Sequence, residues 1–248
     1  MHSHSIDRHT ACQSAPWLAR CLSTSLRGPP VKTTLMTFLP KELRLLVICI
    51  VCAQTGRDIC KGNLSRMFST IAFYPSLGYN LIRNFIQPTK WQWYNRVDES
   101  LILGAMPFQS MADELVQKEN VGGVVCCTEE FELNAAYQSM KEADWSARGV
   151  KFHHVPMTDF FGSTGRAEIE KAVGFIKEVA TDGKSVYVHC KAGRTRSATV
   201  ATCYLMDKNK WMPNVAFEFL RTKRHQALLR NAHWRTCNEF QRYMDSSS

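Results

Sequence analysis

Residues 189–197 read His-Cys-Lys-Ala-Gly-Arg-Thr-Arg-Ser, and this stretch decides the fold of the chain. Before it, residues 185–188 form a short β-branched and aromatic run that follows a turn-like Thr-Asp-Gly-Lys sequence, which predicts a buried strand. After it, Val200, Cys203 and Tyr204 stand at i, i+3 and i+4, which predicts an apolar helical face. We therefore expect a loop that joins a strand directly to the N-terminus of a helix.

This loop has the composition of a phosphate-binding site. A helix N-terminus favours an anion, and Gly193 can take backbone angles that let several N–H groups converge. In that field the pKa of Cys190 should fall, which makes its thiolate a nucleophile at neutral pH. Arg196 offers a planar fork for two phosphate oxygens, and Ser197 can donate a hydrogen bond to the sulfur. The alternative, a buried thiol beside a surface arginine, is disfavoured by the order strand, Cys, Gly, Arg, helix.

The spacing His-Cys, five residues, Arg, Ser resembles the signature of the cysteine-dependent protein tyrosine phosphatase superfamily, in its small dual-specificity branch. Within that branch the chain resembles the family of mitochondrial phosphatidylglycerophosphate phosphatases from about residue 67 to the C-terminus. Residues 1–66 have no recognised counterpart. The segments that carry the resemblance are FYPSL 73–77, WYNRVD 93–98, LGAMP 103–107, ENV 119–121, EEFE 129–132 and KAGRTRSAT 191–199.

The resemblance implies which residues form the site. Cys190 is the expected nucleophile and Arg196 the expected phosphate-binding side chain. Glu129, Glu130 and Glu132 would line the mouth of the pocket, or would form only a solvated acidic turn. The rest of the phosphate cradle would comprise Lys191, Ala192, Gly193, Arg194, Thr195 and Ser197. Of these, Lys191 and Arg194 suit a second acidic group or an anionic lipid surface, unless both are simply exposed basic side chains.

A general acid is also needed, because thiolate attack on an alkyl phosphate would otherwise expel an alkoxide. Asp159 is the best candidate. It lies on a loop with Gly162 after the strand expected at residues 150–155, and it matches the aspartate that precedes the crossover helix in the resembling family. The alternative is that Asp159 only caps a turn, which is the commoner role of a loop aspartate.

Between residues 100 and 209 short apolar strands alternate with helical periodicity, which predicts an α/β fold with a central, mainly parallel sheet flanked by helices. The resemblance implies the dual-specificity type of the protein tyrosine phosphatase fold. The loops after parallel strands meet at one sheet edge, so Cys190, Asp159, Glu129 and Glu130 should converge. The expected strands are 101–105, 121–127, 150–155 and 185–188, and the expected helices are 111–118, 135–147, 166–179, 196–207, 212–224 and 232–244.

The composition supports one catalytic domain with a basic appendage: the chain has 248 residues, 45% of them hydrophobic, and a net charge of +9. Before residue 96 there are eleven basic and three acidic residues, a balance of +8, whereas the remainder has 20 basic and 19 acidic residues. The catalytic body is nearly neutral, which argues against a nucleic-acid partner. We expect a basic extension at 1–66, an apolar and aromatic membrane-associating segment at 67–95, and a phosphatase domain at 96–248.

The basic extension, which is rich in Ser and Thr, has the composition of a mitochondrial transit segment, although an unselected disordered extension or an alternative start at Met67 fits it equally well. The apolar run at 45–53 is too short to cross a bilayer, which takes about 20 residues. Pro75 and Gly78 interrupt the apolar segment at 67–86, which favours an interfacial anchor over a membrane span. The alternative is a helix packed on the domain.

The ten cysteines are expected to be reduced, and no metal or other cofactor is required. Cys49 and Cys52 form a Cys-x-x-Cys without a second ligand pair, and His153 and His154 lack the spaced partners of a metal site. We expect three further cysteines to lie in the core: Cys126, Cys127 and Cys203.

The resemblance implies a metal-independent lipid phosphatase that converts phosphatidylglycerophosphate to phosphatidylglycerol, on the route to cardiolipin, through a cysteinyl-phosphate intermediate. Its expected partners are a phospholipid substrate and an anionic membrane surface. It is expected to be associated with the mitochondrial inner membrane and to be a monomer. The runner-up is a dual-specificity protein phosphatase that acts on phosphotyrosine or phosphoserine. A third reading is an idle phosphate-binding adaptor, which the presence of Cys190, Arg196 and Asp159 together disfavours.

Overall fold

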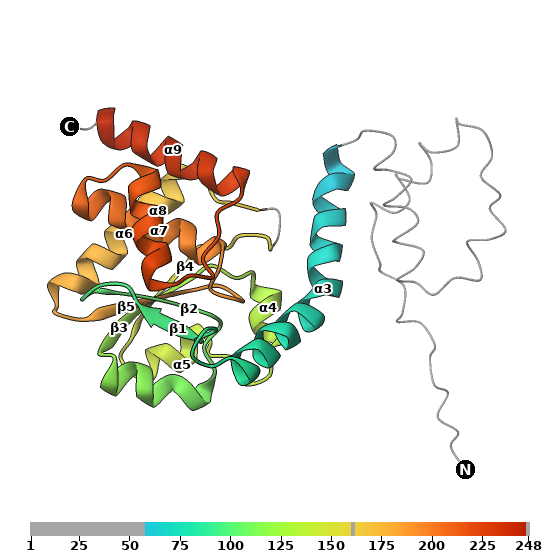
Figure 1. The fold of residues 1–248 in the computed structure, drawn as a ribbon. Coiled ribbons are helices and arrows are strands. Elements are labelled where there is room, and N and C mark those ends of the chain that lie inside the picture. Colours follow the sequence, from blue (N-terminus) through green and yellow to red (C-terminus); the bar gives the residue numbers. More distant parts are fainter. Residues whose placement is uncertain (1–57, 160–161, 247–248) are drawn as a thin grey trace, which may run out of the picture. The chain divides into compact units, whose positions relative to one another are not determined.

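The computed structural model describes residues 58–159 and 162–246 (Figure 1). Residues 61–248 form one compact unit that contains the whole sheet. The predictions for the basic extension, the apolar run at 45–53 and the Cys49–Cys52 pair lie outside the described residues.

The sheet has five strands in the order β1-β2-β5-β3-β4. Strands β2, β5, β3 and β4 are parallel, and β1 is antiparallel to β2. The expected mainly parallel sheet is therefore confirmed. β1 was not expected, because its Tyr-Asn-Arg sequence has no apolar alternation. The bounds are β1 Tyr94–Arg96, β2 Leu101–Gly104, β3 Val121–Cys126, β4 Lys151–His154 and β5 Ser185–His189.

Helices cover both faces of this sheet. Successive side chains of a strand point to opposite sides, so each central strand packs against both layers of helices. In the central strand β5, Val186 and Val188 pack into one apolar cluster and Tyr187 into another. The first cluster includes side chains of α6, α7, α8 and α9, and the second includes Trp145 of α5. Figure 1 shows the first group in orange and red on one side of the sheet. The bounds are α5 Glu142–Ser146, α6 Arg166–Thr181, α7 Arg196–Asn209, α8 Pro213–Lys223 and α9 Asn231–Ser246.

The prediction of one helix across 135–147 is wrong. The chain instead forms α4, Glu130–Ala135, and α5, with a non-helical segment between them. That segment is drawn out of a helix by long-range pairing: Met140 is fully buried and its N–H donates to Pro107 O, while Gln138 takes a positive φ of 55°. The helix expected at 111–118 is a short 3-10 turn, Gln109–Met111, followed by one π-helical turn, Glu114–Lys118.

Helix α3, Asp58–Ile86, runs through Pro75 without ending there. Its side chains Phe73 and Leu77 are buried in a cluster with residues of β3 and α4, and this packing holds the helix together despite the proline. The opposite face is exposed and apolar, with Ile82 at 59% and Phe85 at 87% exposure. Among the described residues, no helix has both the length and the apolar composition needed to cross a membrane.

Candidate active site

The loop from Cys190 to Thr195 joins β5 to α7, as the sequence predicts. Gly193 is required there for two reasons. Its φ is +62°, which side-chain-bearing residues rarely adopt, and a Cβ at this position would lie 2.4 Å from the carbonyl carbon of Gly104. The loop therefore packs directly against the end of β2.

The carbonyl groups of the loop are held from behind by the rest of the domain. Met106 N–H donates to Lys191 O at 3.2 Å, and Leu228 N–H donates to Arg194 O at 2.8 Å. In a trans peptide the N–H points away from the C=O, and the described peptide bonds are all trans. Fixing these carbonyls on the outer side therefore turns the following N–H groups toward the interior of the loop.

Arg224 holds the carbonyl groups of Ala192 and Gly193, which lie between Lys191 and Arg194 in the loop. Its Nε donates to Gly193 O at 2.7 Å and its Nη2 to Ala192 O at 3.3 Å, and the side chain is 1% exposed. This orients the N–H of Arg194 toward the sulfur of Cys190, where it acts as a hydrogen-bond donor. No local sequence pattern marks Arg224 as a residue of the site. The same guanidinium also donates to Gln92 O, Trp93 O and Asn95 Oδ1, so it ties the loop to the segment before β2.

The surroundings of Cys190 favour its thiolate. Burial by itself raises the pKa of this thiol, but the Arg196 guanidinium and hydrogen bonds from Ser197 and the Arg194 backbone outweigh burial, and the net pKa lies below the ordinary value of 9.0. The Ser197 hydroxyl donates to Cys190 Sγ at 3.3 Å. By contrast, burial raises the pKa of Cys127 well above 9.0 and that of Cys126 to about 11, so these neighbouring thiols stay protonated.

His189 is not a base for this thiol. It is fully buried, and burial lowers the pKa of its imidazole to about 3, which keeps the ring neutral. Its Nδ1 lies 3.4 Å from Cys190 O, and the ring lies 5.8 Å from that of Tyr187. We assign it a packing role beneath the loop.

Arg196 is held by Glu132, which was expected at the pocket mouth and instead lies buried against the guanidinium. Nη1 and Nη2 of Arg196 donate to the two oxygens of Glu132 at 2.5 and 3.0 Å, and both side chains are at most 2% exposed. Burial lowers the pKa of Arg196, but Glu132 and Asp159 more than offset it, so the pKa is raised and the guanidinium stays charged. Its buried Nε has no partner among the described residues.

Glu129 and Glu130, expected at the pocket mouth, occupy the start of α4. Glu129 is the N-cap residue and forms a reciprocal capping box with Glu132, and Glu130 is exposed. Neither is among the residues that line the cavity described below.

Asp159 lies beside the loop, after β4. Its Oδ1 is 3.1 Å from Arg196 Nη2, and its Oδ2 accepts a hydrogen bond from Lys191 Nζ. Lys191 is only 3% exposed, so it belongs to the interior of the site and not to its rim. Arg194 is half-buried: its Nε donates to Gln226 O and its guanidinium lies 5.3 Å from the centre of the Trp91 ring. The structure thus brings Cys190, Arg196 and Asp159 together.

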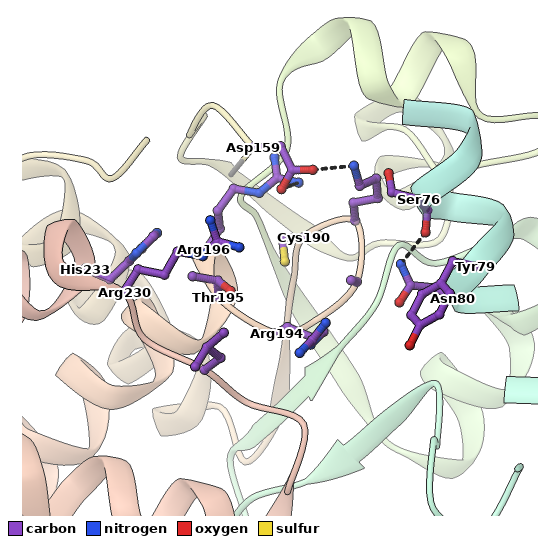
Figure 2. Close-up of a pocket in the computed structure, with 13 residues that line it drawn as sticks. Ser76, Tyr79, Asn80, Asp159, Cys190, Arg194, Thr195, Arg196, Arg230 and His233 are labelled. Atoms are coloured by element: carbon purple, nitrogen blue, oxygen red, sulfur yellow. Dashed lines mark hydrogen bonds and ion pairs between the residues drawn. The ribbon is translucent and has the colours of Figure 1, made fainter. Parts of the chain in front are cut away.

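A cavity of about 240 Å³ opens above Cys190 (Figure 2). One wall comes from α3 and the opposite wall from the start of α9, with the loop between them. The described residues contain no group of three His, Cys, Asp or Glu side chains that could hold a metal ion. The lining residues outside the loop are Ser76, Tyr79, Asn80, Asp159, Leu228, Arg230 and His233.

A thiolate, converging N–H groups, a fixed guanidinium and a carboxyl group at one sheet edge are the parts needed to transfer a phosphoryl group to sulfur and then to water. They define a cysteine-dependent phosphatase. Residues 115–243 match the family described as dual specificity phosphatase, catalytic domain, and the chain belongs to this family.

Within this family, the chain is similar to phosphatases that act on phosphatidylglycerophosphate by name, and to a solved structure of one such phosphatase. The chain is 36% identical over 171 residues to the mouse phosphatidylglycerophosphatase and protein-tyrosine phosphatase 1, a match that covers 68% of this chain and 88% of the mouse protein. It is 37% identical over 173 residues to the Arabidopsis thaliana phosphatidylglycerophosphate phosphatase PTPMT2, covering 69% and 72% of the two chains. The crystal structure of PTPMT1 in complex with PI(5)P superposes with a TM-score of 0.60 at 32% identity, covering 63% of this chain and 99% of that one.

Proposed function

We propose that this chain is a lipid phosphatase that removes the terminal phosphate of phosphatidylglycerophosphate and leaves phosphatidylglycerol. The observation that carries the proposal is the excess of basic side chains at the cavity: Lys191, Arg194, Arg196 and Arg230 line it against Asp159 and the Cys190 thiolate, with Glu132 paired to Arg196 from behind. A phosphotyrosine brings one phosphate to such a site, whereas phosphatidylglycerophosphate brings two. The names of the mouse and Arabidopsis relatives support the same substrate.

In the first proposed step the Cys190 thiolate attacks the terminal phosphorus. The Sγ–P bond forms as the bond from phosphorus to the glycerol oxygen breaks, and Asp159 donates the proton that this oxygen takes up. The N–H groups of the loop and the Nε of Arg196 bind the non-bridging oxygens and stabilise their charge. Phosphatidylglycerol leaves with its hydroxyl group protonated.

In the second step water hydrolyses the cysteinyl phosphate. The Asp159 carboxylate takes a proton from the attacking water, the new P–O bond forms, and the S–P bond breaks. The hydrogen bond from Ser197 stabilises the departing thiolate. Inorganic phosphate then dissociates, and the starting protonation states are restored.

For the membrane partner, we propose that the exposed face of α3 lies in the interface of an anionic bilayer. The same helix borders the cavity, since its Ser76, Tyr79 and Asn80 line it. Introducing two negative charges at exposed apolar positions, Ile82→Glu with Phe85→Glu, should release the protein from cardiolipin-containing vesicles in a sedimentation assay. Retained binding would contradict this use of α3. We also propose that the protein is located at the mitochondrial inner membrane and is a monomer.

The runner-up is a protein phosphatase, which the second half of the mouse relative's name also supports. One purified preparation should be assayed on phosphatidylglycerophosphate in vesicles, on phosphoinositides and on phosphotyrosine and phosphoserine peptides. We expect kcat/KM on phosphatidylglycerophosphate to exceed that on the peptides by at least about 10-fold, the effect of one charge-assisted contact. Cys190→Ser is the inactive control, and it should keep affinity for a phosphate analogue. Preference for the peptides would replace the lipid proposal.

A further inference from the structure

We propose that the wall of the cavity formed by Arg230, His233 and the N-terminus of α9 is a second anionic subsite, which binds the phosphodiester of the lipid while the terminal phosphate occupies the Cys190 loop. This inference rests on the proposed function, because a substrate with a single phosphate would leave the subsite empty.

His233 is the observation that points to a ligand. Its side chain is 2% exposed and lines the cavity. The Gly162 backbone interacts with the ring, but neither ring nitrogen makes a hydrogen bond of full geometry with the described residues. Buried polar groups without partners are rare in folded proteins, and they mark places where a water, ion or ligand completes the site. Burial lowers the pKa of His233, the nearby Gly162 backbone opposes this, and the cations Arg230 and Arg196 lower it further. The neutral ring retains one N–H donor for a phosphate oxygen.

The N-terminus of α9 adds backbone donors at the same wall. The helix has 16 residues, begins at Asn231 and carries no acidic side chain in its first turn. Trp234 N–H makes the bond to Arg230 O that begins the helical ladder, so the N–H groups of 231–233 lie ahead of it. Such N–H groups and the helix dipole favour an anion, and Arg230 at this end adds a full positive charge. Figure 2 shows Arg230 and His233 together on one side of the Cys190 loop.

The opposite wall cannot serve the same purpose. Helix α3 contributes only the neutral side chains Ser76, Tyr79 and Asn80, and the Nδ2 of Asn80 already donates to Ser76 O. The terminal phosphate uses the loop N–H groups and Arg196, whose charge is matched by Glu132. At the α9 wall, by contrast, the ring nitrogens of His233, the side chain of Arg230 and the first N–H groups of the helix face the cavity as donors for a second phosphate.

The test compares two soluble substrates that differ in the second phosphate. Glycerophosphoryl-glycerophosphate, the deacylated head group, has both phosphates, whereas p-nitrophenyl phosphate has one. We expect Arg230→Gln and His233→Leu each to raise KM for the head group by about 10- to 100-fold, the effect of losing one or two charge-assisted contacts. The kcat/KM for p-nitrophenyl phosphate should change by less than about 3-fold, and His233→Gln, which keeps an N–H donor, should recover part of the loss.

Arg235→Gln is the matched control, because Arg235 is an exposed arginine of the same helix outside the cavity lining. It should leave both substrates unaffected. Equal losses on the two substrates in Arg230→Gln or His233→Leu, or no loss on either, would overturn the subsite. Thermal melting reports whether each variant is folded.

A second measurement needs no variant. In the unmodified enzyme, glycerophosphoglycerol, which carries only the phosphodiester, should inhibit hydrolysis of p-nitrophenyl phosphate, whereas glycerol at the same concentration should not. Equal inhibition by the two would overturn the subsite. Failure of the proposed function would show differently, as unmodified enzyme that prefers phosphopeptides to the two-phosphate head group.

Discussion

Glu132 Oε2 lies 2.5 Å from Arg196 Nη1, and the two side chains are 1% and 2% exposed. The second oxygen of the carboxylate accepts from Nη2 at 3.0 Å, so the guanidinium is gripped along one edge. The buried Nε has no partner among the described residues and is the donor of this guanidinium left for a phosphate oxygen. Since Glu132 also accepts from the Glu129 N–H at the start of α4, the orientation of Arg196 is fixed by a helix cap on a different strand–helix unit.

Removing the charge of Glu132 should therefore damage both stability and turnover. Breaking a buried ion pair costs about 3–5 kcal/mol, and misplacing a substrate-binding group by about 1 Å can cost about 100-fold in rate. We expect Glu132→Gln to lower Tm and to reduce kcat/KM on an aryl phosphate by about 100-fold. Glu130→Gln, an exposed residue of the same helix, is the control and should change neither. Wild-type kinetics in Glu132→Gln would contradict this role.

Asp159→Asn should discriminate between substrates by their leaving groups. An alkyl phosphate such as the lipid needs a proton on the departing oxygen, and general acid catalysis contributes about 100- to 10,000-fold. The p-nitrophenolate group leaves without help, so its hydrolysis should fall far less. Steady-state kinetics on both substrates provide the measurement, with the exposed Asp113→Asn as control. An equal loss on the two substrates would assign Asp159 to structure and not to proton transfer.

The rate of alkylation of Cys190 by iodoacetamide should follow its thiolate fraction. Because the pKa of Cys190 is depressed in the folded protein, alkylation should already be fast well below pH 9.0 and should slow as pH falls through that lowered pKa. Ser197→Ala removes one of the hydrogen bonds that lower the pKa, so its profile should move to higher pH. The profile of Thr202→Ala, a buried hydroxyl further along α7, should not move. An unshifted Ser197→Ala profile would show that the hydroxyl does not stabilise the thiolate.

Arg224→Lys tests whether the loop is oriented from behind. Lysine keeps the charge but cannot donate to Gly193 O and Ala192 O in the same fork. We expect the Arg194 N–H to turn away from Cys190 Sγ, which raises the pKa of the thiol and shifts its alkylation profile to higher pH. The kcat/KM should also fall by about 100-fold, the effect of losing one positioned backbone donor. Arg221→Lys on the exposed side of α8 is the matched control. A drop in Tm with an unchanged alkylation profile would reduce Arg224 to a purely structural residue.

The strand, the loop and the helix around Cys190 could be predicted from the sequence because each depends on neighbours within a few residues. The apolar run of β5, the position of Gly193 and the periodicity of α7 are all local signals, and the parallel sheet follows from their alternation with helices. For the same reason the spacing of Cys190 and Arg196 predicted a phosphate site before any contact was known.

The partners of that site were decided only by tertiary structure. Glu132 stands 64 residues from Arg196 and Arg224 stands 31 residues from Gly193, so no local pattern links them. The helix predicted across 135–147 failed for a related reason, since Met140 gains more by burial against β2 than by continuing a helix. Lys191, expected to meet a second acidic group or a lipid surface, is buried against Asp159. Charge pairing in a buried site depends on which surfaces packing brings together, and chain proximity carries no information about that.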